Sequence, residues 1–403
     1  MTGKQNAPEI RFEGFADPWE QRKLGELCTI SKGHGYSKAD IRDAGTPLIL
    51  YGRLYTQYES RIENVDTFAV EQEGSLLSKG NEVIVPASGE TAEDIAVASS
   101  VRRSGIIFGG DLNVVTPVNK LDPDYIALAI TYSKAHDDLA KRAQGKSVVH
   151  VHGNDIAEVE IPYPSESEQK RISTVVLGLD SLITLHQRKY DKLCTVKKSM
   201  LDKMFPKPGE TEPEIRFEGF TDPWEQRKLG NCGTTYGGLT GKTKEDFGHG
   251  NARFIPYTNV FDNPLTDTKR LGAVEIDSSQ NQVAYGDVFF TVSSETPDEV
   301  GMSSVWLSDQ EDVYLNSFCF GYRQDSTFDP HYLAYMLRSR SVRSNLTLLA
   351  QGISRFNISK NKVMELSVPV PSAVEQKQLG QYFTKLDNLI TLHQREPRFA
   401  DTG

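Results

Sequence analysis

The chain has no long apolar run and few cysteines. No stretch approaches the roughly eighteen consecutive apolar residues of a membrane-spanning helix, and the N-terminal MTGKQNAPE lacks the apolar segment of a signal peptide. We therefore expect a cytoplasmic protein. Its four cysteines, Cys28, Cys194, Cys232 and Cys319, lie far apart and form no CxxC pair. This spacing indicates reduced thiols and provides neither a disulfide framework nor a zinc site.

Signatures of catalysis are also missing. The sequence has no glycine-rich loop after a strand that suits S-adenosylmethionine, no Asn-Pro-Pro-aromatic motif of adenine methyltransferases and no Asp...Glu-x-Lys nuclease centre. YGGLTGKTKED at 236–246 is similar to a phosphate-binding loop, but Tyr236 stands where that fingerprint requires glycine. We favour a basic, DNA-facing loop there over an ATP site. His150 and His152 have no third ligand at a suitable spacing, so no metal site is expected.

Negative charge predominates without excluding a nucleic-acid partner. The formal net charge is -10, which by itself argues against DNA binding. The acids, however, gather in 9–20, 59–73 and 210–225, apart from basic groups such as Arg102-Arg103, Lys242-Lys244 and Arg355-Lys360-Lys362. A basic face on an acidic body is therefore compatible with the composition.

What the sequence does contain is a long internal repeat. PEIRFEGFADPWEQRKLG at 8–25 returns as PEIRFEGFTDPWEQRKLG at 213–230, and LDSLITLHQR at 179–188 returns as LDNLITLHQR at 386–395. Between them IPYPSESEQK (161–170) matches VPVPSAVEQK (368–377), and AlaGlnGly at 143–145 matches 350–352. The two copies are separated along the chain by far more than the 20 to 50 residues of a solenoid repeat, so each copy is a whole domain plus a connector.

Both copies change pattern in the same order, which predicts an α+β fold. Short alternating runs mixed with Gly, Ser and Pro indicate strands and loops. Asp122-Pro123 and Asp329-Pro330 then read as N-caps with proline at the first helical position, opening helices that stop before Gly145 and Gly352. A strand ending in a proline doublet follows, so each copy is expected to bury its own core.

A heptad-like stripe follows each proline doublet. From about 166 to 204 the apolar spacing predicts one long helix, and a stripe of the same phase follows in the second copy until Pro397 ends it. Pairing the two antiparallel would give an approximate two-fold arrangement of the globules. His186 and His393 fall on this seam and are expected to meet as register-setting groups rather than catalysts. The predicted helix–helix interface comprises Ile172, Val176, Leu179, Ile183, His186, Leu193, Leu379, Phe383, Leu386, Ile390 and His393.

The series of matching pieces resembles the specificity (S) subunits of type I restriction-modification systems. These pieces are the WEQRKLG openings, the GET and SSET loops, the AQG turns, the PxPxxxEQ helix starts and the LDxLITLHQR helices, and they cover nearly the whole chain. The resemblance implies two globular target-recognition domains separated by two long helices that form an antiparallel coiled coil. The expected boundaries are 1–164 and 206–371 for the domains, 165–205 for the central helix, 372–396 for a shortened C-terminal helix and 397–403 for a tail.

The resemblance also implies function and partners. Each globule would read one half of a bipartite double-stranded DNA site, and the helices would set the spacing and dock two methyltransferase subunits. Restriction subunits would join the full complex used in phage defence. The chain itself would be non-catalytic, and S-adenosylmethionine, ATP and magnesium would be bound by the partner subunits.

The divergent loops hold the candidate DNA-binding side chains. LILYGRLYTQY stands where the second copy has FIPYTNVFDNP, and GKSVVHVHGND where it has GISRFNISKNK. The first globule supplies Lys32, His34, Tyr36, Tyr51, Arg53, Ser88, Glu90, Thr91, Arg102, Lys146, His150 and His152. The second supplies Lys242, Lys244, His249, Tyr257, Asn259, Ser293, Ser294, Glu295, Thr296, Ser354, Arg355 and Asn357. Any single one of them has the alternative of being a solvated loop or turn residue.

Two other function classes stay open at this point. A structural adaptor would bind proteins through the variable loops, whereas a self-sufficient nuclease or methyltransferase would need the motifs that are missing. DNA binding that weakens steeply with salt would distinguish the specificity subunit from the adaptor.

Overall fold

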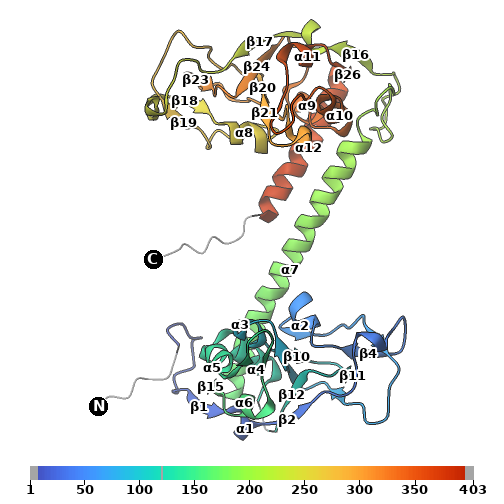
Figure 1. Ribbon diagram of the computed structural model, residues 1–403, viewed down its shortest axis with the longest axis vertical. Coiled ribbons are helices and arrows are strands. Elements are labelled where there is room, and N and C mark those ends of the chain that lie inside the picture. The colour runs from blue at the N-terminus through green and yellow to red at the C-terminus, as the bar shows by residue number, and fades with distance from the viewer. Residues whose placement is uncertain (1–7, 119–120, 395–403) are drawn as a thin grey trace. The chain divides into compact units, whose positions relative to one another are not determined.

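A computed structural model describes residues 8–118 and 121–394 of the chain (Figure 1). Contacts divide the chain into two compact units, Met1–Leu185 and His186–Gly403, and the boundary falls within the long helix. Each unit contains one copy of the repeated globule. Pro397 and the predicted 397–403 tail lie outside the described residues.

Unit 1 is built on two five-stranded sheets, of strand order β2-β12-β8-β10-β5 and β3-β6-β4-β11-β7. Its strands are β1 (Glu20–Lys23), β2 (Cys28–Lys32), β3 (Ile41–Arg42), β4 (Thr46–Ile49), β5 (Arg61–Ile62), β6 (Phe68–Ala69), β7 (Leu77–Lys79), β8 (Glu82–Pro86), β9 (Ser88–Gly89), β10 (Ser99–Val101), β11 (Ser104–Phe108), β12 (Leu112–Pro117), β13 (Gln144–Gly145), β14 (Val149–His150) and β15 (Glu160–Tyr163). Its helices are α1 (Leu24–Leu27), α2 (Arg53–Thr56), α3 (Ala92–Ile95), α4 (Pro123–Tyr132), α5 (Lys134–Arg142), α6 (Gly153–Ala157) and the first part of α7 (Glu166–Lys203).

Unit 2 is built on a four-stranded sheet, β17-β24-β20-β22, and a three-stranded sheet, β19-β18-β23. Its strands are β16 (Glu225–Lys228), β17 (Gly233–Gly237), β18 (Phe247–Ile255), β19 (Gly272–Val274), β20 (Val288–Thr291), β21 (Ser293–Ser294), β22 (Ser303–Val305), β23 (Val313–Leu315), β24 (Cys319–Gln324), β25 (Phe356–Asn357) and β26 (Ser367–Val370). Its helices are α8 (Tyr257–Asp262), α9 (Pro330–Met336), α10 (Arg340–Leu348), α11 (Lys360–Met364) and α12 (Ala373–Gln394), with the second part of α7.

The structure explains why the opening of the repeat is so strictly kept. The EQRK segments form β1 and β16, which pair antiparallel with the proline-containing strands β15 and β26. Upstream, Arg11 forms a bidentate ion pair with Glu168 at the start of α7, and Arg216 forms the same pair with Glu375 in α12. Both carboxylates are buried. The opening therefore ties each globule to the first turns of its own conserved helix.

Two helices follow each Asp-Pro signal and end before Gly145 and Gly352: α4 and α5 in unit 1, and α9 and α10 in unit 2. The caps themselves are as predicted: Asp122 accepts from the Asp124 amide at 3.3 Å, and Asp329 accepts from the Tyr332 amide at 3.0 Å. In unit 1, Ser133 then ends α4 and caps α5 by accepting from the Ala135 amide. A serine that caps a new helix has extended backbone angles and breaks the old one.

The cores lie between helices and sheets. In unit 1, Val83, Val115 and Ile126 share a buried cluster that joins the strands to α4. In unit 2, Leu379, Phe383 and Leu386 of α12 are buried in a cluster with Tyr332 and Tyr335 of α9. Met204 and Phe205, which follow α7 directly, belong to that same cluster. The end of the long helix is thus part of the core of unit 2.

The long helix α7 spans Glu166–Lys203, within two residues of the predicted bounds of 165–205. Its second part runs beside α12 in unit 2 (Figure 1), where Lys197 pairs with Asp387 at 2.5 Å. Over the residues that the structure describes, no helix is both long enough and apolar enough to span a bilayer.

Candidate nucleic-acid interface

A hairpin built on the AlaGlnGly turn carries several candidate residues of unit 1. Strands β13 and β14 form this hairpin, and β14 also pairs with β9, so His150 lies opposite Ser88. The Nδ1 atom of His150 is 3.1 Å from the Ser88 hydroxyl. Gly145 has φ of 145°, and a Cβ there would lie 1.9 Å from the Val148 carbonyl oxygen. The turn therefore requires glycine, and it leaves Lys146 exposed at the tip.

An aromatic pair supports this corner of unit 1. Tyr55 of α2 donates its hydroxyl to the carbonyl of Ser88 at 2.8 Å, and burial raises the pKa of Tyr55 above its ordinary value. Tyr51 packs edge-on against Tyr55, with ring centroids 6.3 Å apart, and remains partly exposed. The corner thus combines a fixed aromatic anchor with polar groups that point to solvent.

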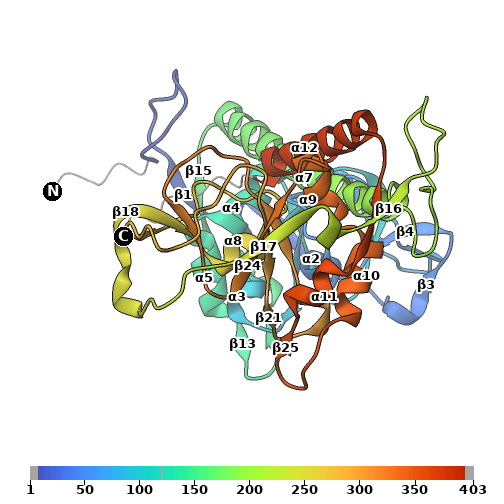
Figure 2. The ribbon, with the colours of Figure 1, turned by 90° about the horizontal axis from the view of Figure 1, so that it is seen from above.

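Unit 2 repeats the same frame with different exposed side chains. Ser293 of β21 lies opposite Asn357 of β25, and Tyr257 donates its hydroxyl to the Ser293 carbonyl at 2.7 Å. Gly352 has φ of 143° and occupies the position of Gly145. Figure 2 shows β21 and β25 side by side, with the chain projecting beyond them. Exposed Ser354 and Arg355 follow the turn where unit 1 has Ser147 and Val148.

Most candidate residues are solvent-exposed in the structure. In unit 1 the exposed ones are Lys32, His34, Tyr51, Glu90, Thr91, Arg102, Lys146, His150 and His152. In unit 2 they are Lys244, His249, Glu295, Thr296, Ser354, Arg355 and Asn357. Ser88, Tyr257 and Ser293 are half-buried beneath the hairpins. Two of the exposed groups are engaged locally: Thr91 caps α3, and Arg102 lies 3.7 Å from buried Asp124.

Two candidates in unit 1 have structural roles, which corrects their assignment. Tyr36 is 4% exposed, and its hydroxyl bonds Ser75 and accepts from the Gln72 amide. The side chain of Arg53 is 11% exposed because it forms ion pairs with Glu59 and Asp66. Both are turned inward to hold loops, and neither presents its polar group to a ligand.

Three candidates in unit 2 require the same correction. Lys242 pairs with Asp277 at 2.8 Å, and buried Asn259 donates to the carbonyls of Asp267 and Arg270. Buried Ser294 donates to the Thr296 carbonyl. Within 236–246, Lys242 is therefore held by a carboxylate and is not free to bind a phosphate group. Lys244 is the exposed cation of that loop.

His249 is an exposed candidate whose pKa is shifted. Its Nε2 donates to the Glu245 carbonyl at 2.8 Å, and Nδ1 lies 3.4 Å from Glu275. The carbonyl bond, with the Glu275 carboxylate second, raises the pKa of His249 above its ordinary value. An anion at this loop would therefore meet a histidine that protonates more readily than usual.

Sequence reasoning missed three side chains near the hairpins. Tyr55 supports Ser88, Ile353 is almost fully exposed at the unit 2 tip, and Phe318 is exposed on the segment whose carbonyl accepts from the Val292 amide. An apolar residue beside the glycine of a tight turn was the available signal for Ile353. Phe318 gives no comparable signal, because its placement depends on a pairing that is distant in sequence.

The part of the predicted seam that lies in unit 2 is formed in the structure. Nδ1 of His186 and Nδ1 of His393 are 2.9 Å apart, so one ring donates to the other as predicted. Leu193 packs on the buried cluster that contains Leu379, Phe383 and Leu386, and Ile390 is half-buried. Ile172 packs against the core of unit 1, and Val176 on the same helix is half-buried.

Leu179 and Ile183 are 54% and 62% exposed within unit 1. Their pairing with the second copy's stripe stays a prediction, while α12 directs Leu379, Phe383 and Leu386 into the core of unit 2.

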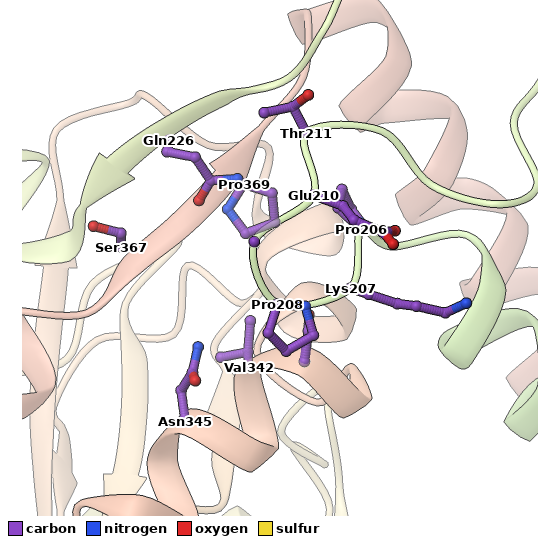
Figure 3. A pocket seen from close by; sticks show the side chains of 12 residues that line it. Pro206, Lys207, Pro208, Glu210, Thr211, Gln226, Val342, Asn345, Ser367 and Pro369 are labelled. Atoms are coloured by element: carbon purple, nitrogen blue, oxygen red, sulfur yellow. The ribbon is translucent and has the colours of Figure 1, made fainter.

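One surface pocket of about 330 Å³ lies in unit 2 (Figure 3). The linker after α7 crosses β16, β26 and α10 there, and Pro206, Pro208, Thr211 and Asn345 contribute to its wall. None of the candidate DNA-binding residues lines it, so it is separate from the hairpin corner. Within 8–118 and 121–394, no three His, Cys, Asp or Glu side chains gather as metal ligands would.

Comparisons with known proteins agree over nearly the whole chain. The family described as "Type I restriction modification DNA specificity domain" matches residues 16–194 and 221–398. Two relatives from Methanocaldococcus jannaschii are the type I restriction enzyme MjaVIII specificity subunit, 20% identical, and the putative MjaX specificity subunit, 22% identical. Each alignment covers 98% of this chain and 92% of the relative.

A solved structure shares the fold. The S subunit of a type I restriction-modification system from M. genitalium aligns with a TM-score of 0.53 at 14% identity. The alignment covers 95% of this chain and 92% of that one.

Proposed function

The chain belongs to the type I restriction modification DNA specificity family, and from that premise we propose that each of its two target-recognition domains reads one half of a bipartite DNA site through its hairpin corner. A specificity subunit directs the reactions of the other subunits to a particular DNA sequence. Base identity is read from groove edges, where each base pair has its own pattern of donors and acceptors in the major groove.

One observation carries this proposal. Both units build the same frame, a tyrosine hydroxyl bonded to a serine carbonyl beneath a hairpin that turns at a left-handed glycine. The exposed groups on that frame differ at matching positions: Lys146, Val148 and His150 in unit 1 stand where unit 2 has Ile353, Arg355 and Asn357. A constant frame with variable tips is the arrangement expected of two readers of two different half-sites.

The helices would supply the spacing and the docking surface. With α7 spanning Glu166–Lys203, the helix is about 57 Å long at 1.5 Å per residue. That length suffices to hold two readers about one duplex turn apart, or roughly 34 Å. Two methyltransferase subunits, with restriction subunits in the full complex, would then bind S-adenosylmethionine, ATP and magnesium and carry out modification and cleavage.

The test is a pair of tip exchanges in cells that contain the modification subunits. Lys146→Ala with His150→Ala is expected to alter or relax one half of the methylated site, and Ser354→Ala with Arg355→Ala the other half. The exposed Lys385 of α12 provides a control, because Lys385→Ala removes a cation outside both hairpins. Genome-wide mapping of methylated adenines reads the result. If either pair changes both halves, or changes neither while the control does, the hairpin corners are not the readers.

The modular arrangement has its own test. Replacing residues 30–160 with the corresponding domain of another family member should change one half-site and leave the other half and the gap unchanged. An altered gap would show that spacing does not reside in the helices.

A further inference from the structure

Each hairpin tip exposes one branched apolar side chain that is not among the predicted DNA-binding residues. Ile353 of unit 2 is 97% exposed, and Val148 of unit 1 is 49% exposed. The other exposed side chains of the same tips are polar, such as Ser354 beside Ile353 and Ser147 beside Val148. Each tip therefore offers a small apolar contact within a polar surface.

The two tips combine this apolar group with a cation in opposite order. In the aligned repeat, Lys146 corresponds to Ile353 and Val148 corresponds to Arg355. A single exposed apolar residue is common on protein surfaces and by itself indicates nothing. Here the same two positions hold one cation and one branched apolar side chain in both copies, which indicates that both tips bind the same class of ligand.

The hairpins hold these side chains in fixed places. In unit 2, Gln351 and Asn357 each donate a backbone N–H to the carbonyl of the other, both at 2.9 Å. In unit 1, Val149 at the start of β14 is 9% exposed, and neighbouring side chains of an extended segment point to opposite faces, so Val148 points to solvent. A contact made by a preformed turn costs little ordering entropy on binding.

The chemistry of the tips fits the major groove of a DNA duplex. An exposed cation is attracted to the phosphates. The base edges in that groove carry donors and acceptors, and their apolar group is the C5-methyl of thymine, which aliphatic side chains contact. A protein partner would instead require a contiguous apolar surface of roughly a few hundred Å², which one apolar side chain among polar neighbours does not supply.

We propose that Ile353 contacts the C5-methyl group of a thymine in the half-site of unit 2, and that Val148 contacts a thymine methyl in the half-site of unit 1. Ile353 directly follows the turn glycine, whereas Val148 is the third residue after it. The two thymines therefore lie at different places relative to their own hairpins. This inference rests on the proposed function of the hairpin corners as DNA readers.

The test measures DNA binding by the complex of the full chain with its modification subunits, by fluorescence anisotropy at one salt concentration. The duplexes carry the mapped methylation site, and each thymine of a half-site is replaced in turn by uracil, which lacks the methyl group and keeps the pairing groups. At one position of the unit 2 half-site, uracil should weaken binding about fourfold, the loss of one buried methyl group. Ile353→Ala should weaken binding to the thymine duplex and make this replacement neutral. Val148→Ala should do the same in the other half-site.

Exposed residues of the same types provide matched controls outside the hairpins. Ile276 of unit 2 is 53% exposed and Val70 of unit 1 is 67% exposed. Ile276→Ala and Val70→Ala should leave the affinity and the uracil sensitivity unchanged. The exchange variant Ile353→Lys/Arg355→Val gives unit 2 the order of unit 1, and it should move the uracil sensitivity to a neighbouring base pair.

Equal uracil sensitivity in the unmodified chain and in Ile353→Ala overturns the thymine contact. Uracil sensitivity that stays at the original base pair in the exchange variant also overturns it. The double variant Ser354→Ala/Arg355→Ala separates this failure from a failure of the proposed function. If that variant alters the half-site while uracil sensitivity is independent of Ile353, the hairpin reads DNA without a thymine contact. If neither change affects the half-site, the hairpin corner is not a reader and both proposals are wrong.

Discussion

The ion pair between Arg216 and Glu375 provides the sharpest test of the structure. Its two hydrogen bonds are 2.7 and 2.9 Å long, and the Glu375 side chain is 1% exposed. Arg216→Met removes both bonds and leaves a buried carboxylate without its cation. Breaking such a pair costs about 3 to 5 kcal/mol in the free energy of unfolding. We expect the lower end, about 3 kcal/mol, because the Arg216 side chain is 15% exposed and its charge is partly solvated.

The first copy contains a matched control. Arg11 and Glu168 form the same pair with the same exposures, but Glu168 also accepts from the Trp19 indole at 3.1 Å. The indole of Trp224 has no hydrogen-bond partner in the described structure. Arg11→Met therefore leaves one donor on its carboxylate, and its cost should be smaller by about 1.5 kcal/mol or more, the contribution of a hydrogen bond to a charged group.

Calorimetry with segment-resolved hydrogen exchange measures both changes. For units of this size, about 3 kcal/mol corresponds to a fall in Tm of roughly 9 °C. The double variant Arg216→Met/Glu375→Gln should recover part of the loss, since the buried charge is gone. An Arg11→Met cost equal to or above that of Arg216→Met would refute the role assigned to Trp19, and an unchanged Tm for Arg216→Met would refute the buried pair itself.

Three further predictions concern pH, the hairpin glycine and salt. Burial, and then the charges of Lys189 and His186, lower the pKa of His393 below its ordinary 6.5. Because the unfolded chain then binds more protons than the folded one, the contact with His186 should weaken as pH falls through about 6.5. Hydrogen exchange at 386–394 should become faster over that range, and His393→Gln should abolish this pH dependence. Gly352→Ala places a Cβ 2.0 Å from the Arg355 carbonyl oxygen at φ of 143°, so it should destabilise unit 2 by about 1 to 3 kcal/mol. The control Gly178→Ala has open space around its Cβ and should stabilise helix α7 by about 0.5 to 1 kcal/mol. Equal changes in Tm for the two variants would contradict the strained turn. If Lys146 or Arg355 contacts phosphate, each alanine variant should reduce the log–log salt slope of DNA binding by about 0.9, and an unchanged slope would remove that residue from the phosphate contacts.

Local signals in the sequence were sufficient for the elements and their order. The Asp-Pro caps, the turns at Gly145 and Gly352 and the 166–204 helix depend on a few neighbouring residues or on a regular period. They are present in the structure at or within a residue or two of the expected positions. The break at Ser133, where a single cap residue ends one helix and begins the next, was not part of the prediction.

The sequence could not predict which of the polar loop residues face solvent. Tyr36, Arg53, Lys242 and Asn259 are of the same residue types as the exposed candidates. The partners of Lys242 and Tyr36, Asp277 and Ser75, lie far along the chain, and those of Arg53 and Asn259 lie on other turns of the same loops. Only tertiary folding brings such partners within hydrogen-bond distance, and that contact turns a candidate ligand contact into a structural bond.

The sequence alone determined that this protein contains two copies of a unit made of one domain and one helix, because an internal sequence repeat can be recognised without coordinates. The tertiary structure decided that the two copies are not equivalent. Leu179 and Leu386 stand in nearly identical segments, yet one is exposed and the other buried. The difference arises because burial depends on what packs over a side chain, and the end of α7 packs over α12 with no described counterpart over the first copy.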